Sequence, residues 1–243
     1  MHIFRQDKLT HMMVLADSHG HSFRRAVDLG LFPSRSVSVC ANHDTTAAGL
    51  RNPNSFSRGL YQFRTVIKFM ERSDILAIQV GEVDCGHLIW RRVEKGWTLD
   101  EALAASLAGY QGFLDELHGM GFHKIILTGA ILPLLSDDQI ADGDEARRTV
   151  LVSQRDRTDL TLRYNAALRD IAHERGLRYV DITDDLTDPA TGMADPAYRH
   201  PHPGDHHLEL ERGAYCWAMA LAAALVDYDL QARPAPTLLH QPG

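Results

Sequence analysis

The sequence predicts an α/β fold, a three-layer α/β/α sandwich built around a five-stranded parallel sheet. Three observations predict it: short apolar runs typical of buried strands, helical apolar stripes between them, and a regular alternation of the two. Parallel sheets carry helices on both faces, so their strands are apolar along most of their length. The chain has 243 residues, 44% hydrophobic and 23% charged, which suits one domain spanning 1–243.

Five apolar runs that end in small or polar residues are predicted strands. They are residues 12–15, 36–40, 74–80, 124–127 and 178–182. Five segments with apolar residues at helical spacing are predicted helices. They lie around residues 23–29, 60–70, 99–117, 159–175 and 208–226. Thr98 and Glu101 form a capping box that fixes the start of the third helix.

The segments between these elements differ in character. Residues 41–58 are rich in Asn, Thr, Ser and Gly and are a predicted loop. Residues 136–148 are acidic and aperiodic, as expected for a surface loop or a lid. The last residues, 233–243, contain prolines and are an irregular tail. We see no internal repeat and no linker between domains.

The composition narrows the class of protein. The formal net charge is −7 and no basic run is present, so we expect neither nucleic-acid nor membrane binding. The N-terminus lacks the apolar run of a signal peptide, and no stretch is long enough to span a membrane. We therefore expect a cytoplasmic protein. Cys40, Cys85 and Cys216 are far apart and odd in number, which indicates reduced thiols.

Four polar segments follow predicted strands or lie near their carboxyl ends, where doubly wound sheets bind ligands. They are residues 17–19, 42–58, 81–85 and 200–207. Ser18 comes directly after a strand and at the start of a helix. The positive end of that helix dipole favours negative charge developing near the serine, as in an oxyanion.

The order of these motifs resembles the SGNH, or GDSL-type, hydrolases. Ala16-Asp17-Ser18 matches the Gly-Asp-Ser motif after the first strand, and Gly81-Glu82-Val83-Asp84 matches the third motif. Asp205-His206-His207-Leu208 matches the last motif, before the C-terminal helix. Residues 163–168 and 176–181 resemble the helix and strand that precede it. With Cys85, the third motif is similar to a variant in SGNH-like proteins of glycan-related clusters. The resemblance implies a flavodoxin-like SGNH hydrolase fold over nearly the whole chain.

The resemblance also implies the roles of the site residues. Ser18 would be the nucleophile, His207 the general base and Asp205 the group that orients the imidazole. The backbone N–H groups of Ser18 and Gly49 would form the oxyanion hole, with Gly59 as the alternative glycine. No cofactor and no metal are implied, and the substrate would be a small-molecule or glycan ester. Candidate substrate contacts are Asp17, His19, Asn42, Glu82 and Asp84.

Two positions depart from the family pattern. The acid usually lies three residues before the His, but that position is Gly204, and Asp205 lies only two before His207. This Asp-x-His spacing is similar to that of SGNH-like acetyltransferases. Val83 replaces the Asn that completes the oxyanion hole, and loss of such a donor costs about 3 kcal/mol in the transition state. Candidate substitutes are Asn42, His43 and Asn52.

Other interpretations of the same residues remain open. Ser18 or Asp17 could simply cap the helix that follows. Glu82 and Asp84 could be an acid/base pair for glycoside cleavage. A metal could bind the histidine-rich segment, whose candidate ligands are His200, His202, Asp205, His206 and His207. Sugar rings could stack on Trp90, Trp97 or Trp217.

Of the two adjacent histidines, His206 and His207, only one can face the serine, and the following Leu208 favours His207. Three functions fit the pattern. The preferred one is an ester hydrolase that removes a small acyl group, such as acetyl, from a carbohydrate or metabolite. The second is an acyltransferase with the same triad, and the third is a catalytically weak binding protein, as Val83 suggests.

Overall fold

The computed structural model describes residues 10–140 and 152–231, which form an α/β structure around one sheet. All strand pairs are parallel, and the strand order is β2-β1-β3-β4-β5, as in flavodoxin-like folds. The strands are β1 (Met12–Ala16), β2 (Val37–Ala41), β3 (Ile75–Gln79), β4 (Ile125–Thr128) and β5 (Arg178–Val180). The predicted fold class and all five predicted strands are confirmed.

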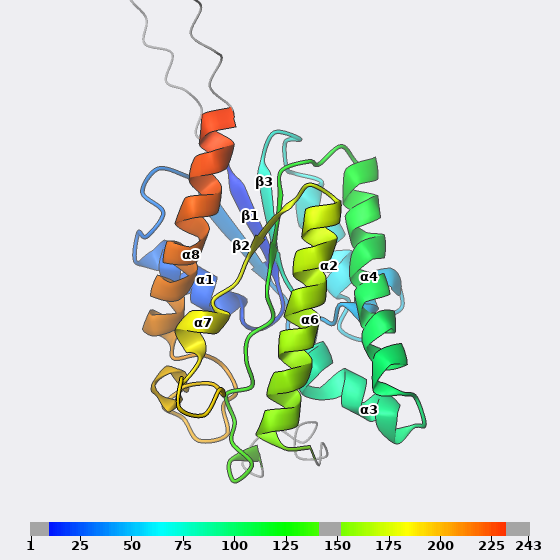
Figure 1. Ribbon diagram of the computed structural model, residues 1–243. Coiled ribbons are helices and arrows are strands. Elements are labelled where there is room, and N and C mark those ends of the chain that lie inside the picture. The colour runs from blue at the N-terminus through cyan, green and yellow to red at the C-terminus, as the bar shows by residue number, and fades with distance from the viewer. Residues whose placement is uncertain (1–9, 141–151, 232–243) are drawn as a thin grey trace, which may run out of the picture.

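Helices cover both faces of the sheet (Figure 1). One face packs against α1 (Gly20–Asp28) and α8 (Leu210–Gln231). The other packs against α2 (Gly59–Ile67), α4 (Leu99–Gly119) and α6 (Gln154–Glu174). The short helices are η1 (Ala48–Arg51), η2 (Asp84–Leu88), α3 (Ile89–Glu94), α7 (Thr183–Leu186) and η4 (Pro196–Tyr198). None of the described helices has the length and apolar character needed to cross a membrane.

An aromatic contact joins the two helices on the first face. The rings of Phe23 in α1 and Trp217 in α8 stack with their centroids 4.9 Å apart, and both side chains are fully buried. Such a pair stabilises a core by about 0.5–1.5 kcal/mol beyond the burial of its area. The contact fixes the start of the chain's first helix against its last one. Trp217 is therefore a core residue, and the proposal that it stacks sugar rings is wrong.

Two differences from the sequence prediction come from local hydrogen bonding. Helix α6 begins at Gln154 rather than at residue 159, because the Ser153 hydroxyl accepts the N–H of Asp156 and caps an earlier turn. The predicted loop 41–58 contains the short helix η1, and the segment after β3 continues directly into η2 and α3. Neither segment has an apolar stripe long enough to be recognised as a helix.

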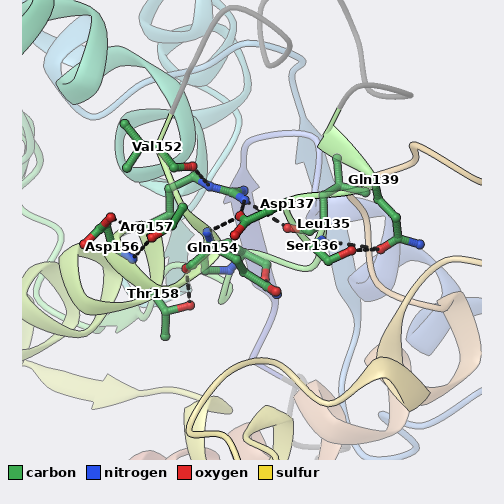
Figure 2. Close-up of polar contacts among 11 residues, drawn as sticks. Leu135, Ser136, Asp137, Gln139, Val152, Gln154, Asp156, Arg157 and Thr158 are labelled. Atoms are coloured by element: carbon green, nitrogen blue, oxygen red, sulfur yellow. Dashed lines mark hydrogen bonds and ion pairs between the residues drawn. The ribbon is translucent and has the colours of Figure 1, made fainter.

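The connection between β4 and α6 is anchored on α6 (Figure 2). Arg157 is buried and donates to the Leu135 carbonyl at 3.0 Å. The Gln154 side chain donates to the Pro133 carbonyl at 2.8 Å, and its backbone N–H donates to Asp137 at 2.5 Å. The first part of the predicted acidic loop is thus tied to the helix. Residues 141–148 of that loop and the predicted tail 233–243 lie outside the described residues.

The three cysteines lie apart and form no disulfide. Cys85 is buried, and burial raises the pKa of its thiol well above the usual value. The thiol is therefore protonated at neutral pH and unreactive, as expected from the sequence.

A glycine in α4 allows η1 to approach the helix closely. A Cβ at Gly109 would overlap the Ala47 carbonyl oxygen and lie 2.8 Å from the Cα of Ala48. We expect Gly109→Ala to lower the free energy of unfolding by about 2 kcal/mol, because backbone atoms must move apart. Urea unfolding followed by circular dichroism measures this. Gly119→Ala in the same helix, where a Cβ meets nothing within 4 Å, should be neutral or stabilising by up to about 1 kcal/mol. Equal effects of the two substitutions would contradict this packing.

Candidate active site

Ser18 lies where β1 ends and α1 begins, with 4% of its surface exposed. Its hydroxyl makes no hydrogen bond to any residue that the structure describes, and the helix start has no side-chain cap. Instead, Asp17 accepts the N–H of His19 at 3.0 Å. The interpretation of Ser18 as a simple helix cap is therefore wrong, and its hydroxyl is available for chemistry.

Asp205 and His207 form a close pair in the loop before α8. One carboxylate oxygen of Asp205 accepts both the backbone N–H of His207 at 2.9 Å and its ring Nδ1 at 2.7 Å. A carboxylate acceptor at Nδ1 requires the proton there, so Nε2 of the neutral ring carries the lone pair. That Nε2 is buried and has no hydrogen-bond partner among the described residues. The pair has the geometry of a general base and the acid that orients it.

The serine loop and the histidine loop face one another. His19 and His21 follow Ser18 in the chain. Their rings lie 4.9 and 5.9 Å from the ring of His207, measured between centroids. No hydrogen bond joins Ser18 to His207 within 10–140 and 152–231. In many hydrolases this bond tightens only when substrate binds, so the spacing is compatible with catalysis.

A cavity of about 220 Å³ opens beside the histidine. It is lined by His19, His21, Ser22, His200, Asp205, His207, Leu208 and Leu210. A larger hollow of about 550 Å³ lies over residues 53–61 and contains neither Asp205 nor His207. The smaller cavity is the candidate substrate site because the paired imidazole lines it, although Ser18 lines neither hollow.

Solved structures similar to this chain include GDSL-type lipases, acylhydrolases and esterases. A predicted arylesterase from Agrobacterium tumefaciens is 14% identical and aligns over 90% of this chain and 100% of its own, with a TM-score of 0.61. A GDSL-like lipase from Bacteroides thetaiotaomicron is 16% identical over 90% and 88%, with a TM-score of 0.57. An acetyl xylan esterase is 14% identical over 88% and 99%, with a TM-score of 0.51.

This chain has the SGNH hydrolase fold. The agreement covers most of the length of each chain. No family model matches the sequence, and no curated protein matches it. The likeness is therefore one of fold. A fold does not determine a reaction, which depends on the residues of the site.

In this SGNH fold, Asp84 anchors the loop after β2. Its carboxylate accepts the N–H of Ala47 at 2.6 Å, the N–H of Ala48 at 3.2 Å and the hydroxyl of Ser106. The side chain has no exposed surface. Asp84 is thus a structural residue, and neither a substrate contact nor half of a glycosidase pair with Glu82 is supported.

Two of the donors that the sequence suggested for the oxyanion hole, Gly49 and Asn42, already have partners. The Gly49 N–H donates to the carbonyl and hydroxyl oxygens of Thr46, at 3.1 and 3.0 Å. The Asn42 amide donates to Thr45 at 2.7 Å and to the Ser57 carbonyl at 2.9 Å. Both predictions overlooked the turns within this loop, which satisfy its polar groups internally. The alternative glycine, Gly59, is also occupied, through a 3.4 Å bond to Ser57.

The register of the sheet favours His43, one of the substitute donors that the sequence suggested, through its backbone N–H. Ala16 of β1 pairs with Ala41 of β2, so Ser18 and His43 follow their strands at the same distance. The His43 ring lies 5.4 Å from that of His21. Among the described residues, the backbone N–H groups of Ser18 and His43 donate to no partner. These two amides are the candidates for an oxyanion hole that has Val83 in place of an amide side chain.

A buried polar cluster supports the serine loop. Asp17, His19 and Glu82 are 0%, 1% and 4% exposed, and Nε2 of His19 lies 3.6 Å from the Glu82 carboxylate. Burial raises the pKa of Asp17 to about 7, against the opposing charge of His19. Asp17 and Glu82 do not line the cavity, whereas His19 does. Of the predicted substrate contacts, only His19 lines this cavity.

The histidines of the last loop divide into two groups. His200 lies 3.3 Å from the second carboxylate oxygen of Asp205, and His202 is exposed with its ring on the Pro203 carbonyl. The metal site suggested by the sequence, which included both, is not assembled. His206 and His207 converge instead with His19, about 190 positions earlier in the chain. Sequence spacing gave no signal for this association because it depends on the fold.

Burial sets the protonation of the candidate base. Burial, together with the charge of His19, lowers the pKa of His207 to about 4, although Asp205 acts in the opposite direction. Burial opposes ionisation of Asp205 too, but the hydrogen bonds and charge of His207 hold the pKa of that carboxyl below its usual value. The site therefore contains a neutral imidazole beside an ionised carboxylate at neutral pH.

This protonation predicts an acid-tolerant activity. A general base acts when it is deprotonated, so kcat/KM for p-nitrophenyl acetate should be nearly constant down to about pH 5 and fall as pH drops through about 4. An ordinary imidazole, with a pKa of 6.5, would be almost wholly protonated at pH 5. In His19→Gln, which removes a positive charge, the acidic limb should move to higher pH. A limb near 6.5 in the unmodified protein, with circular dichroism unchanged, would contradict this.

Proposed function

We propose that this protein is a serine ester hydrolase that removes a small acyl group, such as acetyl, from a carbohydrate or metabolite. The observation that carries the proposal is the Asp205–His207 pair, whose unpartnered Nε2 lies at the edge where Ser18 follows β1. A serine hydroxyl is a weak nucleophile at neutral pH and needs such a base. The SGNH fold supports the same assignment, because its solved examples include lipases and esterases.

The chemistry would proceed in two steps. His207 takes the proton of the Ser18 hydroxyl as its oxygen attacks the acyl carbonyl, and the tetrahedral intermediate then expels the alcohol, which receives that proton. Water, deprotonated by His207, attacks the acyl-serine, and the Ser18 oxygen leaves with the proton. Asp205 keeps Nδ1 protonated and stabilises the imidazolium in both steps. The Ser18 and His43 amides would hold the oxyanion, at the positive end of α1.

Two features support a small acyl group. The cavity beside His207 has a volume of about 220 Å³, below the range of about 300–1,000 Å³ usual for larger ligands. Histidines and Asp205 make up most of its lining, which suits a polar alcohol better than a long acyl chain. One solved structure with this fold is an acetyl xylan esterase. A sugar or metabolite acetate is therefore the proposed substrate class.

The nucleophile and base are tested by single substitutions. Ser18→Ala and His207→Ala should each lower kcat for p-nitrophenyl acetate by about 10⁴-fold or more, because they remove groups that act only in the transition state. Asp205→Ala should have an effect of similar order, since the ring loses its orientation. His206→Ala should retain activity, because the carboxylate that orients the base is bonded to His207. Steady-state kinetics of the four variants, with unfolding curves as the control for folding, make the test.

Covalent labelling of the serine distinguishes a wrong nucleophile from a wrong reaction type. A fluorophosphonate probe should label the unmodified protein and His206→Ala but not Ser18→Ala. Absence of label on the unmodified protein would reject Ser18 as a nucleophile. If activity is lost in His206→Ala but kept in His207→Ala, the base is His206 and the assignment to His207 is wrong. Label without hydrolysis of any acetyl ester would reject the hydrolase in favour of acyl transfer.

A further inference from the structure

Three imidazoles from two distant loops converge at the mouth of the site. His19 follows Ser18, whereas His206 and His207 precede α8. One ring nitrogen from each lies within 4.8 Å of the other two. The ring centroids of His206 and His207 are 4.1 Å apart, and that of His19 lies 5.6 and 4.9 Å from them. The catalytic mechanism uses only His207.

His19 is the member whose position most needs an explanation. It is 1% exposed, and neither ring nitrogen has a hydrogen-bond partner among the described residues. Its ring faces His207, whose Nε2 is also buried without a partner. Buried polar atoms in folded proteins are nearly always satisfied, and those that are not commonly mark a functional site. Two such side chains facing one another indicate a ligand that accepts lone pairs from both.

We propose that His19, His206 and His207 form a binding site for Zn²⁺, and that the bound ion inhibits the enzyme. Imidazole nitrogens suit zinc, whereas Mg²⁺ and Ca²⁺ prefer oxygen ligands. Zn²⁺ bound to Nε2 of His207 occupies the lone pair that must accept the Ser18 proton. The inhibition rests on the function proposed above, but the binding does not.

The geometry needs only small adjustments to hold the ion. Tetrahedral zinc with Zn–N bonds of about 2.0–2.1 Å separates its nitrogen ligands by about 3.4 Å, so the rings would close by roughly 1 Å. Side-chain rotation in the loop that carries His206 and His207 can supply this movement. The fourth position would stay open on the cavity, for water or a substrate oxygen.

Two of the three histidines, His207 and His19, already have a carboxylate near one ring nitrogen. Asp205 accepts from Nδ1 of His207 at 2.7 Å, and Glu82 lies 3.6 Å from Nε2 of His19. Metal-binding histidines commonly bond a carboxylate through their second nitrogen, which fixes the ring and raises its basicity. These two charges also offset that of the ion. The arrangement thus provides orientation and charge balance in addition to the three nitrogens.

Binding is measured first, independently of activity. The full-length protein is stripped with EDTA, dialysed and titrated with ZnCl₂ by calorimetry, and with Co²⁺ to observe the visible bands of a tetrahedral complex. We expect one tight site per chain and no binding of Mg²⁺. His206→Ala should lower zinc affinity by at least about 100-fold, since loss of a group that merely orients a ligand costs about 10–100-fold. His202→Ala, an exposed histidine in the same loop, is the matched control and should bind normally.

Turnover of p-nitrophenyl acetate gives the second readout. Zinc should inhibit the unmodified protein and His202→Ala, and EDTA should restore both, while His206→Ala keeps its basal activity and resists zinc. No tight zinc binding, or equal binding by His206→Ala, would overturn the site. Binding without inhibition, or with stimulation, would overturn the inhibitory role. Variant-dependent binding in a protein that hydrolyses no ester would support the metal site and reject the proposed hydrolase.

Discussion

The pairing of β1 with its two neighbours determines where the catalytic groups can lie. Ala16 is aligned with Ala41 of β2 and with Gln79 of β3, so three strands end at one level of the sheet. The loops that carry the serine, the candidate second oxyanion donor and the third motif therefore leave the sheet side by side. A slip of one residue would exchange the faces of β1 and move the loop with it. The stacked aromatics of α1 and α8 then bring the last loop, with His207, to the same edge.

Buried charge is distributed unevenly around this edge. Asp84 is fully buried but accepts three hydrogen bonds, which offset the loss of hydration and fix the loop after β2. Asp17 is equally buried, yet one of its oxygens has no partner among the described residues, and its pKa is raised to about 7. Both ring nitrogens of His19 also lack a hydrogen-bond partner among the described residues. Asp17 and His19 thus leave unsatisfied polar atoms beside the serine, as expected where function competes with stability.

The strands, the fold class and the serine loop could be predicted because their signals are local: apolar runs, small residues after them, and motifs in a fixed order. The pairing of Asp205 with His207 was suggested by the same ordered motifs. The role of Gly49 could not be predicted, since its N–H is taken by Thr46 in a turn that Asp84 fixes from another loop. The approach of His19 to His206 depends likewise on two loops that only the folded sheet brings together.

The short spacing between acid and base has a physical explanation in the loop itself. Gly204 has a φ of 76°, a conformation that other residues rarely adopt, and the Asp205 N–H closes the preceding turn on the His202 carbonyl at 3.2 Å. The turn directs the Asp205 carboxylate forward along the chain. One of its oxygens then receives both the backbone N–H and the ring Nδ1 of His207, so main chain and imidazole are fixed together. An acid two residues from its base can orient the ring because it also holds the backbone from which that ring extends.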